Sequence, residues 1–132
     1  IQLADKNLIE DNKLCIVSAM GSAKLAREII GLAEFSVVSR FHSMIASLSK
    51  SVPCITIGWN HKYQEAAKPF NLAELVIDYE NLSLETIKLK TARILVNLEV
   101  YKDSMKKIAI LEAEKARNDV EKAVLGFISN GK

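Results

Sequence analysis

The chain has few of the features that mark secreted scaffolds and membrane proteins. Only two of its 132 residues are cysteine, and both, Cys15 and Cys54, lie inside short apolar runs that are typical of strands. No secretory leader precedes them, which favours reduced, buried thiols in a cytosolic protein over a disulfide framework. No apolar run approaches the roughly 20 residues that a membrane-spanning helix needs. We therefore expect a soluble protein without a transmembrane segment.

Neither sign of charge predominates. Lysine and arginine total 18 and aspartate and glutamate total 16, so the net charge is +2. This value is too small to indicate nucleic acid or an anionic membrane as a partner. Basic and aromatic residues do not alternate as they would on a nucleic-acid surface. We expect no nucleic acid among the partners.

Several common site motifs are also missing. The sequence has no cysteine cluster or close histidine pair for zinc, and no glycine-rich loop for a nucleotide or dinucleotide. No serine lies in a G-x-S-x-G turn. We expect neither a metal nor a cofactor.

What the chain does have is the composition of one globular domain, with 49% hydrophobic and 26% charged residues. Strand-like and helix-like segments alternate over its first part. Strands are expected at Leu14–Val17, Phe35–Val38, Cys54–Ile57 and Leu75–Ile77. Between them, helices are expected from Ser22 to about Gly31, from Arg40 to Lys50 with Phe41, Met44, Ile45 and Leu48 inward, and from His61 to Lys68 before Pro69. This alternation predicts an α/β fold with a Rossmann-like parallel sheet and flanking helices.

The last third has a different pattern and predicts a helical extension. One helical stripe, capped by Ser83, comprises Leu84, Ile87, Ile94, Leu95 and Leu98. A second comprises Tyr101, Met105, Ile108, Ala116, Val120, Val124 and Phe127. We divide the chain into an α/β core over residues 1–82 and C-terminal helices over residues 83–132, packing on the same domain or on a neighbouring one. Because the chain begins at Ile1 without a targeting pattern, we expect it to be part of a longer protein.

Three cationic or titratable residues follow two of the expected strands. Arg40 and His42 come just after Phe35–Val38, and Lys62 follows Cys54–Ile57 after a five-residue loop. Ligands of open parallel sheets bind at the carboxyl ends of the strands, and three such groups in one crevice suit an anion. The helix that begins at this point adds its backbone N–H groups and its dipole.

Each of these residues also has a purely structural interpretation. His42 could fix the turn through a backbone hydrogen bond, or it could bind phosphate and transfer a proton. Arg40 fits structural support with a secondary role in binding, and a lysine such as Lys62 is usually solvated. His61 and Trp59 are weaker candidates, because such a histidine often faces away and a tryptophan more often packs than stacks on a sugar.

The same stretch resembles the polysaccharide pyruvyl transferase family. The resemblance is an ordered set: Ser39-Arg40-x-His42-x-x-x-x-Ala46, then Val52-Pro53-x-Ile55, and Lys62 twenty residues after the histidine. It continues through Phe70-Asn71-Leu72 and Leu75–Asp78, and it covers roughly Lys13 to Asp78.

The resemblance implies an enzyme that transfers the enolpyruvyl unit of phosphoenolpyruvate to a saccharide acceptor, forming a ketal and releasing phosphate. It implies the C-terminal domain of a B-type glycosyltransferase-like fold, with the donor bound by His42 and Lys62 and supported by Arg40. His42 is then the candidate catalytic acid. A further family arginine and most of the acceptor site are expected in a missing N-terminal domain, so the fragment is expected to be inactive alone.

Two other interpretations stay open. The chain could be the C-terminal half of a nucleotide-sugar glycosyltransferase, in which a carboxylate binds the donor ribose; Glu65 is the only acidic residue expected near the crevice. It could also be a non-catalytic Rossmann-like binding or assembly module. We expect a cytoplasmic protein, which a lipid-linked acceptor could hold peripherally at the membrane.

Overall fold

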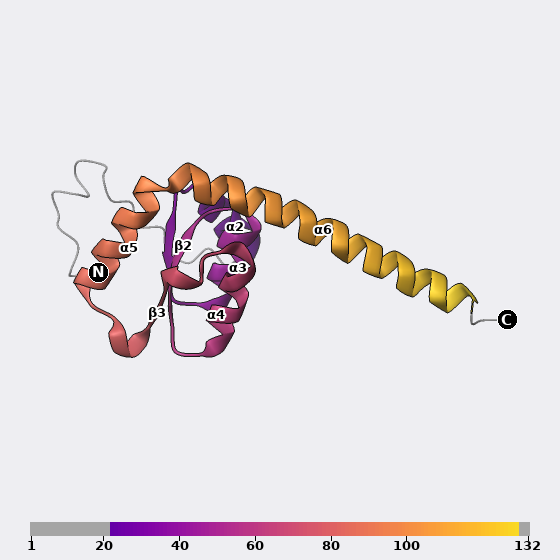
Figure 1. The fold of residues 1–132 in the computed structure, drawn as a ribbon, viewed down its shortest axis with the longest axis horizontal. Coiled ribbons are helices and arrows are strands. Elements are labelled where there is room, and N and C mark those ends of the chain that lie inside the picture. The colour runs from indigo at the N-terminus through magenta and orange to yellow at the C-terminus, as the bar shows by residue number, and fades with distance from the viewer. Residues whose placement is uncertain (1–21, 130–132) are drawn as a thin grey trace.

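The computed structural model describes residues 22–129 of the chain, and the expected strand at Leu14–Val17 lies outside them. Three parallel strands in the order β1-β2-β3 alternate with helices (Figure 1). The strands are β1 (Ser36–Val38), β2 (Cys54–Gly58) and β3 (Val76–Asp78), and the helices are α2 (Ala23–Gly31), α3 (Phe41–Ser49), α4 (His61–Ala67), α5 (Leu84–Val96) and α6 (Leu98–Ser129). Short 3-10 turns occupy η1 (Lys68–Phe70), η2 (Ala73–Leu75) and η3 (Tyr79–Asn81). The α/β fold with a parallel sheet, flanking helices and a helical C-terminal third is confirmed.

The central strand β2 is the most buried of the three. It pairs in parallel with β1, where Val37 lies opposite Ile55, and with β3, where Gly58 lies opposite Asp78. Pro53 precedes it, as expected, because a residue without an N–H is tolerated at a strand start. The Pro53 carbonyl accepts a hydrogen bond from the Ser36 N–H at 3.0 Å. Since helices cover both faces of β2, its residues alternate little in polarity.

Side-chain caps fix where most of the helices begin. Ser22 accepts a hydrogen bond from the Leu25 N–H, Asn60 from the Lys62 N–H, and Ser83 from the Thr86 N–H. Each cap satisfies one backbone donor that the first helical turn leaves without a partner. The expected caps at Ser22 and Ser83 are therefore confirmed.

Helices α3 and α4 lie on one face of the sheet and α5 lies on the other (Figure 1). The core between these layers consists of buried apolar residues: Val38, Met44, Leu48, Cys54, Ile55, Tyr63, Ala67, Leu72, Leu75, Ile77, Ile94 and Met105. Of the four residues expected on the inner side of α3, Ile45 is instead 42% exposed. It faces the hollow between α2 and α3, which the sheet does not cover.

Glu74 holds the two C-terminal helices against the sheet layer. Its carboxylate pairs with the Arg93 guanidinium of α5 at 2.5 Å and accepts a hydrogen bond from the Tyr101 hydroxyl of α6 at 2.6 Å. Its backbone carbonyl accepts a hydrogen bond from Lys90. Burial, and then the neighbouring Glu74 carboxylate, raise the pKa of Tyr101. The Glu74 side chain thereby connects η2 to α5 and α6.

The long helix α6 extends well beyond the domain (Figure 1). Its first turns pack through the fully buried Met105, whereas every residue from 110 to 125 is exposed. The expected stripe along this helix is thus correct only near its start, and Val120, Val124 and Phe127 are exposed because no other described element lies beside them. Leu84 and Leu95 of the first stripe are exposed as well, while Ile94 is buried. None of the helices within residues 22–129 is both long and apolar enough to cross a membrane.

Candidate functional site

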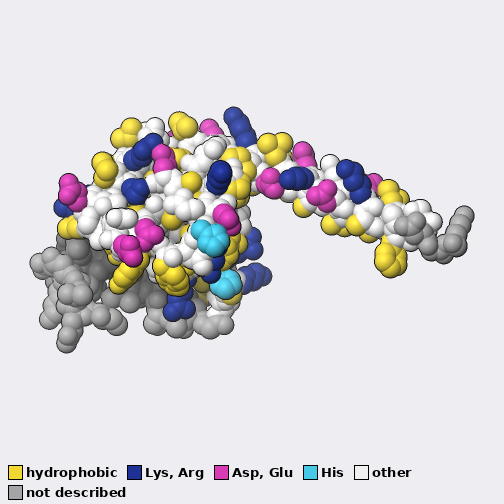
Figure 2. All heavy atoms as spheres, turned by 60° about the horizontal axis from the view of Figure 1, so that its bottom comes forward, with side chains coloured by type: hydrophobic (Ala, Val, Ile, Leu, Met, Phe, Trp, Pro, Cys, Tyr) yellow, Lys and Arg dark blue, Asp and Glu magenta, His cyan; other side chains and the backbone are white. Residues whose placement is uncertain are grey.

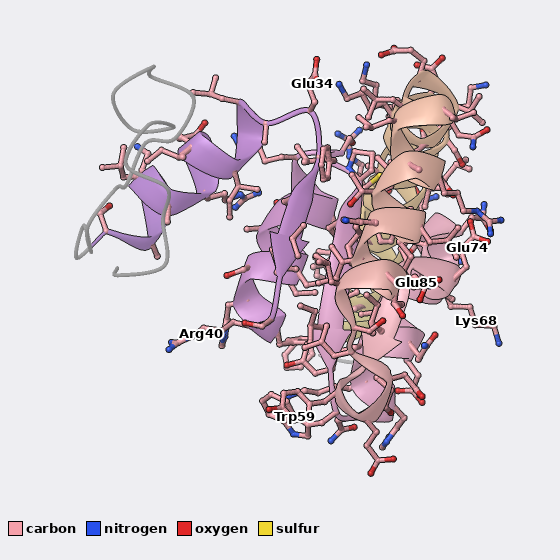
Figure 3. The ribbon with its side chains drawn as sticks, turned by 90° about the vertical axis from the view of Figure 1, so that its left-hand side faces the viewer. Glu34, Arg40, Trp59, Lys68, Glu74 and Glu85 are labelled. Carbon is pink, nitrogen blue, oxygen red and sulfur yellow. The ribbon has the colours of Figure 1, made fainter. Side chains whose placement is uncertain are left out.

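The residues that follow the three strands gather at one edge of the sheet. Parallel strands place their carboxyl ends together, so the loops after β1, β2 and β3 are neighbours. Figure 3 shows Arg40, after β1, and Trp59, after β2, at the same end of the molecule, with Glu34, which precedes β1, at the other. The loops after β1 and β2 thus lie at one end of the sheet, and the expected convergence of Arg40, His42 and Lys62 on one crevice stays a prediction.

Tyr63 is the residue that packs this edge together. Its ring is 2% exposed and makes edge-to-face contacts with Phe41, at 5.5 Å between centroids, and with Trp59, at 6.0 Å. Its hydroxyl donates a hydrogen bond to the Ser39 carbonyl at 3.4 Å. The ring also covers Gly58, where a Cβ atom would lie 2.5 Å from Tyr63 Cδ2. Tyr63 was not among the expected site residues, and the only signal for it is its place in the first turn of α4, on the buried side of that helix.

Lys62 lies above this aromatic cluster. Its Nζ atom is 5.0 Å from the centroid of the Phe41 ring and 5.5 Å from that of Tyr63. Both distances are within the range of a cation–π interaction, which holds an ammonium group over a ring face. These contacts position the ammonium group, and because the lysine is exposed, a ligand can reach it.

Arg40 is exposed at the start of α3. It occupies the N-cap position with extended backbone angles, but its side chain accepts no hydrogen bond from the helix. Among the residues that the structure describes, α3 therefore starts without the side-chain cap that α2, α4 and α5 have. A helix start of this kind is electrostatically suited to an anion.

His42 is exposed in the first turn of α3 and lines a hollow of about 350 Å³ between α2 and α3. Arg27 of α2, which was not among the expected site residues, lines the same hollow. Both histidines of the chain lie on the face shown in Figure 2, with both basic and acidic side chains near them. Within residues 22–129 no hydrogen bond or ion pair joins His42 to Lys62. The two residues thus share the basic edge but line different parts of it.

Two further hollows adjoin Trp59 at the same edge. One, of about 400 Å³, is apolar and is lined by Ser39, Ile57, Trp59, Tyr79 and Leu82. The other, of about 280 Å³, is polar, and its lining includes Trp59, Asn60, His61, Gln64 and Asp78. The acidic residue at this edge is therefore Asp78. The expectation that Glu65 alone would supply a carboxylate there is wrong, because β3 ends at Asp78 and places it opposite Gly58.

Residues 1–61 match the family model described as polysaccharide pyruvyl transferase. The resemblance inferred from the sequence is confirmed over this stretch. No curated protein and no solved structure matches the chain.

The pyruvyl transferase match includes Arg40 and His42 and ends one residue before Lys62. It begins earlier than Lys13, where the resemblance was expected to start, and it does not reach Asp78, where the resemblance was expected to end. Part of the matched stretch precedes residue 22 and lies outside the described residues. Within the described residues, the match spans α2, β1, α3 and β2, and these elements include Arg27 and His42 but not Lys62.

Proposed function

We propose that this chain is the donor-binding domain of a polysaccharide pyruvyl transferase. In this proposal Arg40, His42 and Lys62 bind phosphoenolpyruvate at the carboxyl edge of the sheet. The observation that supports it best is the start of α3, where Arg40 and His42 lie in the family-matched stretch at a helix terminus without a side-chain cap. The reaction transfers the enolpyruvyl group to a saccharide and forms a ketal.

The chemistry of the donor fits the charges at this edge. Phosphoenolpyruvate is small and carries a phosphate and a carboxylate. The planar guanidinium of Arg40 can bind either group through two hydrogen bonds, and the Lys62 ammonium can bind as a point charge. The α3 N–H groups supply further donors. The same groups would stabilise the phosphate as it leaves, when its negative charge grows.

His42 is proposed as the acid that starts the transfer. A proton delivered to C3 of the enolpyruvyl group turns the methylene into a methyl group and makes C2 electrophilic. One sugar hydroxyl then adds to C2, the C2–O bond to phosphate breaks, and a second hydroxyl adds to form the ketal. The proton of one sugar hydroxyl returns to His42 and replaces the proton that His42 delivered to C3. The proton of the other hydroxyl leaves with phosphate. No metal, cofactor or redox partner is needed for this balance.

The proposal places part of the active site outside this chain. The donor and acceptor must be held within reacting distance, and this alignment supplies much of the rate. We propose that a second Rossmann-like domain, in a B-type arrangement, provides a further arginine and part of the acceptor site. The proposed setting is cytoplasmic, with a lipid-linked acceptor where the enzyme works at a membrane.

Calorimetric binding of phosphoenolpyruvate to the protein tests the donor assignment. Phosphoenolpyruvate should bind, with His42→Ala and Lys62→Ala each weakening the affinity about ten-fold or more, because each removes a charge-assisted hydrogen bond. Lys68→Ala is a matched control, since Lys68 is exposed at the opposite end of α4 from Lys62. The chain by itself should release no phosphate from donor and saccharide.

Two results would overturn this proposal. The first is a chain that binds a nucleotide sugar but not phosphoenolpyruvate, which would place it among glycosyltransferases. The second is phosphoenolpyruvate affinity that is unchanged in both His42→Ala and Lys62→Ala, which would return these residues to purely structural roles.

A further inference from the structure

Trp59 is 71% exposed at this edge. Its indole ring makes an edge-to-face contact with the Tyr63 ring, at 6.0 Å between centroids, and most of the residue stays exposed. Tyr79, 67% exposed, lines the apolar hollow with Trp59. Covering the face of a large aromatic side chain is energetically favourable, because apolar surface is removed from water. The exposed indole beside the hollow can therefore bind a ligand that has a flat apolar face.

Trp59 also lines the polar hollow. Asp78, Gln64 and Asn60 there supply carboxylate and amide groups, and His61 adds an imidazole. One oxygen of Asp78 accepts a hydrogen bond from the Glu80 N–H at 3.1 Å, which orients the carboxylate. A carboxylate has several lone-pair sites and can accept further bonds. The hollow thus offers several hydrogen-bonding groups close together.

Saccharides match this combination of surfaces. A sugar ring has an apolar C–H face that can cover an indole, and its rim of hydroxyl groups donates and accepts hydrogen bonds. Ligand sites typically combine apolar or aromatic lining with a few polar groups, in volumes of about 300 to 1,000 Å³. The two hollows, of about 400 and 280 Å³, are near the lower end of that range, which suits one or two sugar units.

The hollows also adjoin the residues proposed to bind the donor. Ser39 of the apolar hollow precedes Arg40, and His61 of the polar hollow precedes Lys62. Figure 3 shows Trp59 and Arg40 at the same end of the molecule. A saccharide on Trp59 would therefore lie next to a donor held at the start of α3. Its hydroxyls could then reach the electrophilic carbon of the donor. The negative charge of Asp78 would repel the phosphate of another donor molecule from this surface.

From these observations we infer that the surface formed by Trp59, Tyr79 and Asp78 is a saccharide subsite that binds the acceptor sugar on this domain. The assignment of this sugar as the acceptor rests on the proposed function. Saccharide binding itself does not, because it depends only on the aromatic and polar residues named here.

Tryptophan fluorescence gives a direct test, because Trp59 is the only tryptophan of the chain. The protein is titrated with neutral oligosaccharides of galactose, mannose and N-acetylglucosamine, and separately with uridine diphosphate and with phosphoenolpyruvate. At least one neutral saccharide should shift or quench the emission saturably. Asp78→Asn and Tyr79→Ala should each weaken this saccharide about ten-fold, since each removes a direct contact.

Glu65→Gln is the matched control for Asp78→Asn. It makes the same change of charge on α4, outside both hollows, and should leave the saccharide affinity unchanged. Circular dichroism of each variant verifies that the helices are retained. Calorimetry on Trp59→Ala should show a loss of saccharide binding without the fluorescence readout.

The outcomes separate this inference from the proposed function. Saccharide binding without phosphoenolpyruvate binding would support the subsite while removing the donor assignment. The subsite is wrong if no neutral saccharide changes the emission of a folded protein, or if Asp78→Asn and Tyr79→Ala bind as the parent does. A saturable response to uridine diphosphate alone would assign the surface to a nucleotide instead.

Discussion

The Tyr63 hydroxyl donates a hydrogen bond to the Ser39 carbonyl at 3.4 Å, which joins the segment after β2 to the segment after β1. The same ring contacts Phe41 and Trp59, and Lys62 lies over it. The candidate donor site and the inferred saccharide subsite therefore share one buried support. A disturbance of this ring should affect both ligands together.

Gly58→Ala tests how closely that support is packed. The added Cβ would lie 2.5 Å from Tyr63 Cδ2, so the ring or strand β2 must shift. Overpacking of this kind typically costs about 1–3 kcal/mol. We expect a lower free energy of unfolding in urea together with weaker binding of phosphoenolpyruvate. Gly126→Ala is the control, because no atom lies within 4 Å of its Cβ position and alanine favours a helix. Equal effects of the two substitutions would show that the ring is not tightly packed on Gly58.

Ser51→Gly should stabilise the fold. Ser51 has a φ of 54° after α3, and the next N–H, that of Val52, donates a hydrogen bond to the Ser47 carbonyl at 2.9 Å. A left-handed residue after a helix favours glycine, which has no Cβ to clash. We expect a gain of about 1 kcal/mol or less in the free energy of unfolding, measured by urea titration. Ser49→Gly, inside α3, should instead destabilise by a similar amount, and a loss in both variants would contradict the assignment.

The Cys54 thiol should make the stability of the protein fall at high pH. Burial raises the pKa of Cys54 to about 11 from its ordinary value of 9.0. Between these values the unfolded thiol loses its proton while the folded thiol keeps it, so unfolding is favoured as pH rises. The slope due to this group should be about 1.4 kcal/mol per pH unit at most. Thermal unfolding of Cys54→Ala from pH 8 to 11 should lack this slope, and identical slopes in both proteins would contradict the prediction.

Removal of the distal part of α6 should leave the stability of the domain nearly unchanged. Residues 110 to 125 are exposed, so a chain that ends at Ala109 loses little packing. Met105→Ala should instead cost about 2–5 kcal/mol, because its side chain is fully buried. Differential scanning calorimetry compares the two. A large fall in melting temperature for the truncated chain would show that the distal helix is covered in solution.

Local signals were sufficient for the elements and their order. Ser22 and Ser83 mark helix starts because their hydroxyls accept backbone hydrogen bonds within the first turn. Pro53 and the β-branched run after it define β2. The position of Arg40 after one strand and Lys62 after another placed both at the carboxyl edge, since parallel strands end on the same side.

Burial and contacts between distant segments could not be predicted from these local signals. Helical spacing put Ile45, Leu95 and Val120 on apolar stripes, but burial depends on how closely another element packs on that stripe, and these three residues stay exposed. Asp78 has the sequence signal of a loop residue. Its place in the polar hollow follows from the parallel register of β2 and β3, which aligns it with Gly58.

By itself, then, the sequence determined the parallel α/β architecture, the helix starts at Ser22 and Ser83, and the places of Arg40 and Lys62 after β1 and β2, because each depends on spacing and on contacts a few residues apart. Tertiary structure alone decided that Tyr63 supports the edge, that Trp59 stays uncovered between two hollows, and that His42 lies with Arg27 while Lys62 lies over Phe41. These relationships join segments that are distant along the chain, and only the packing of helices on the sheet fixes the distances between them.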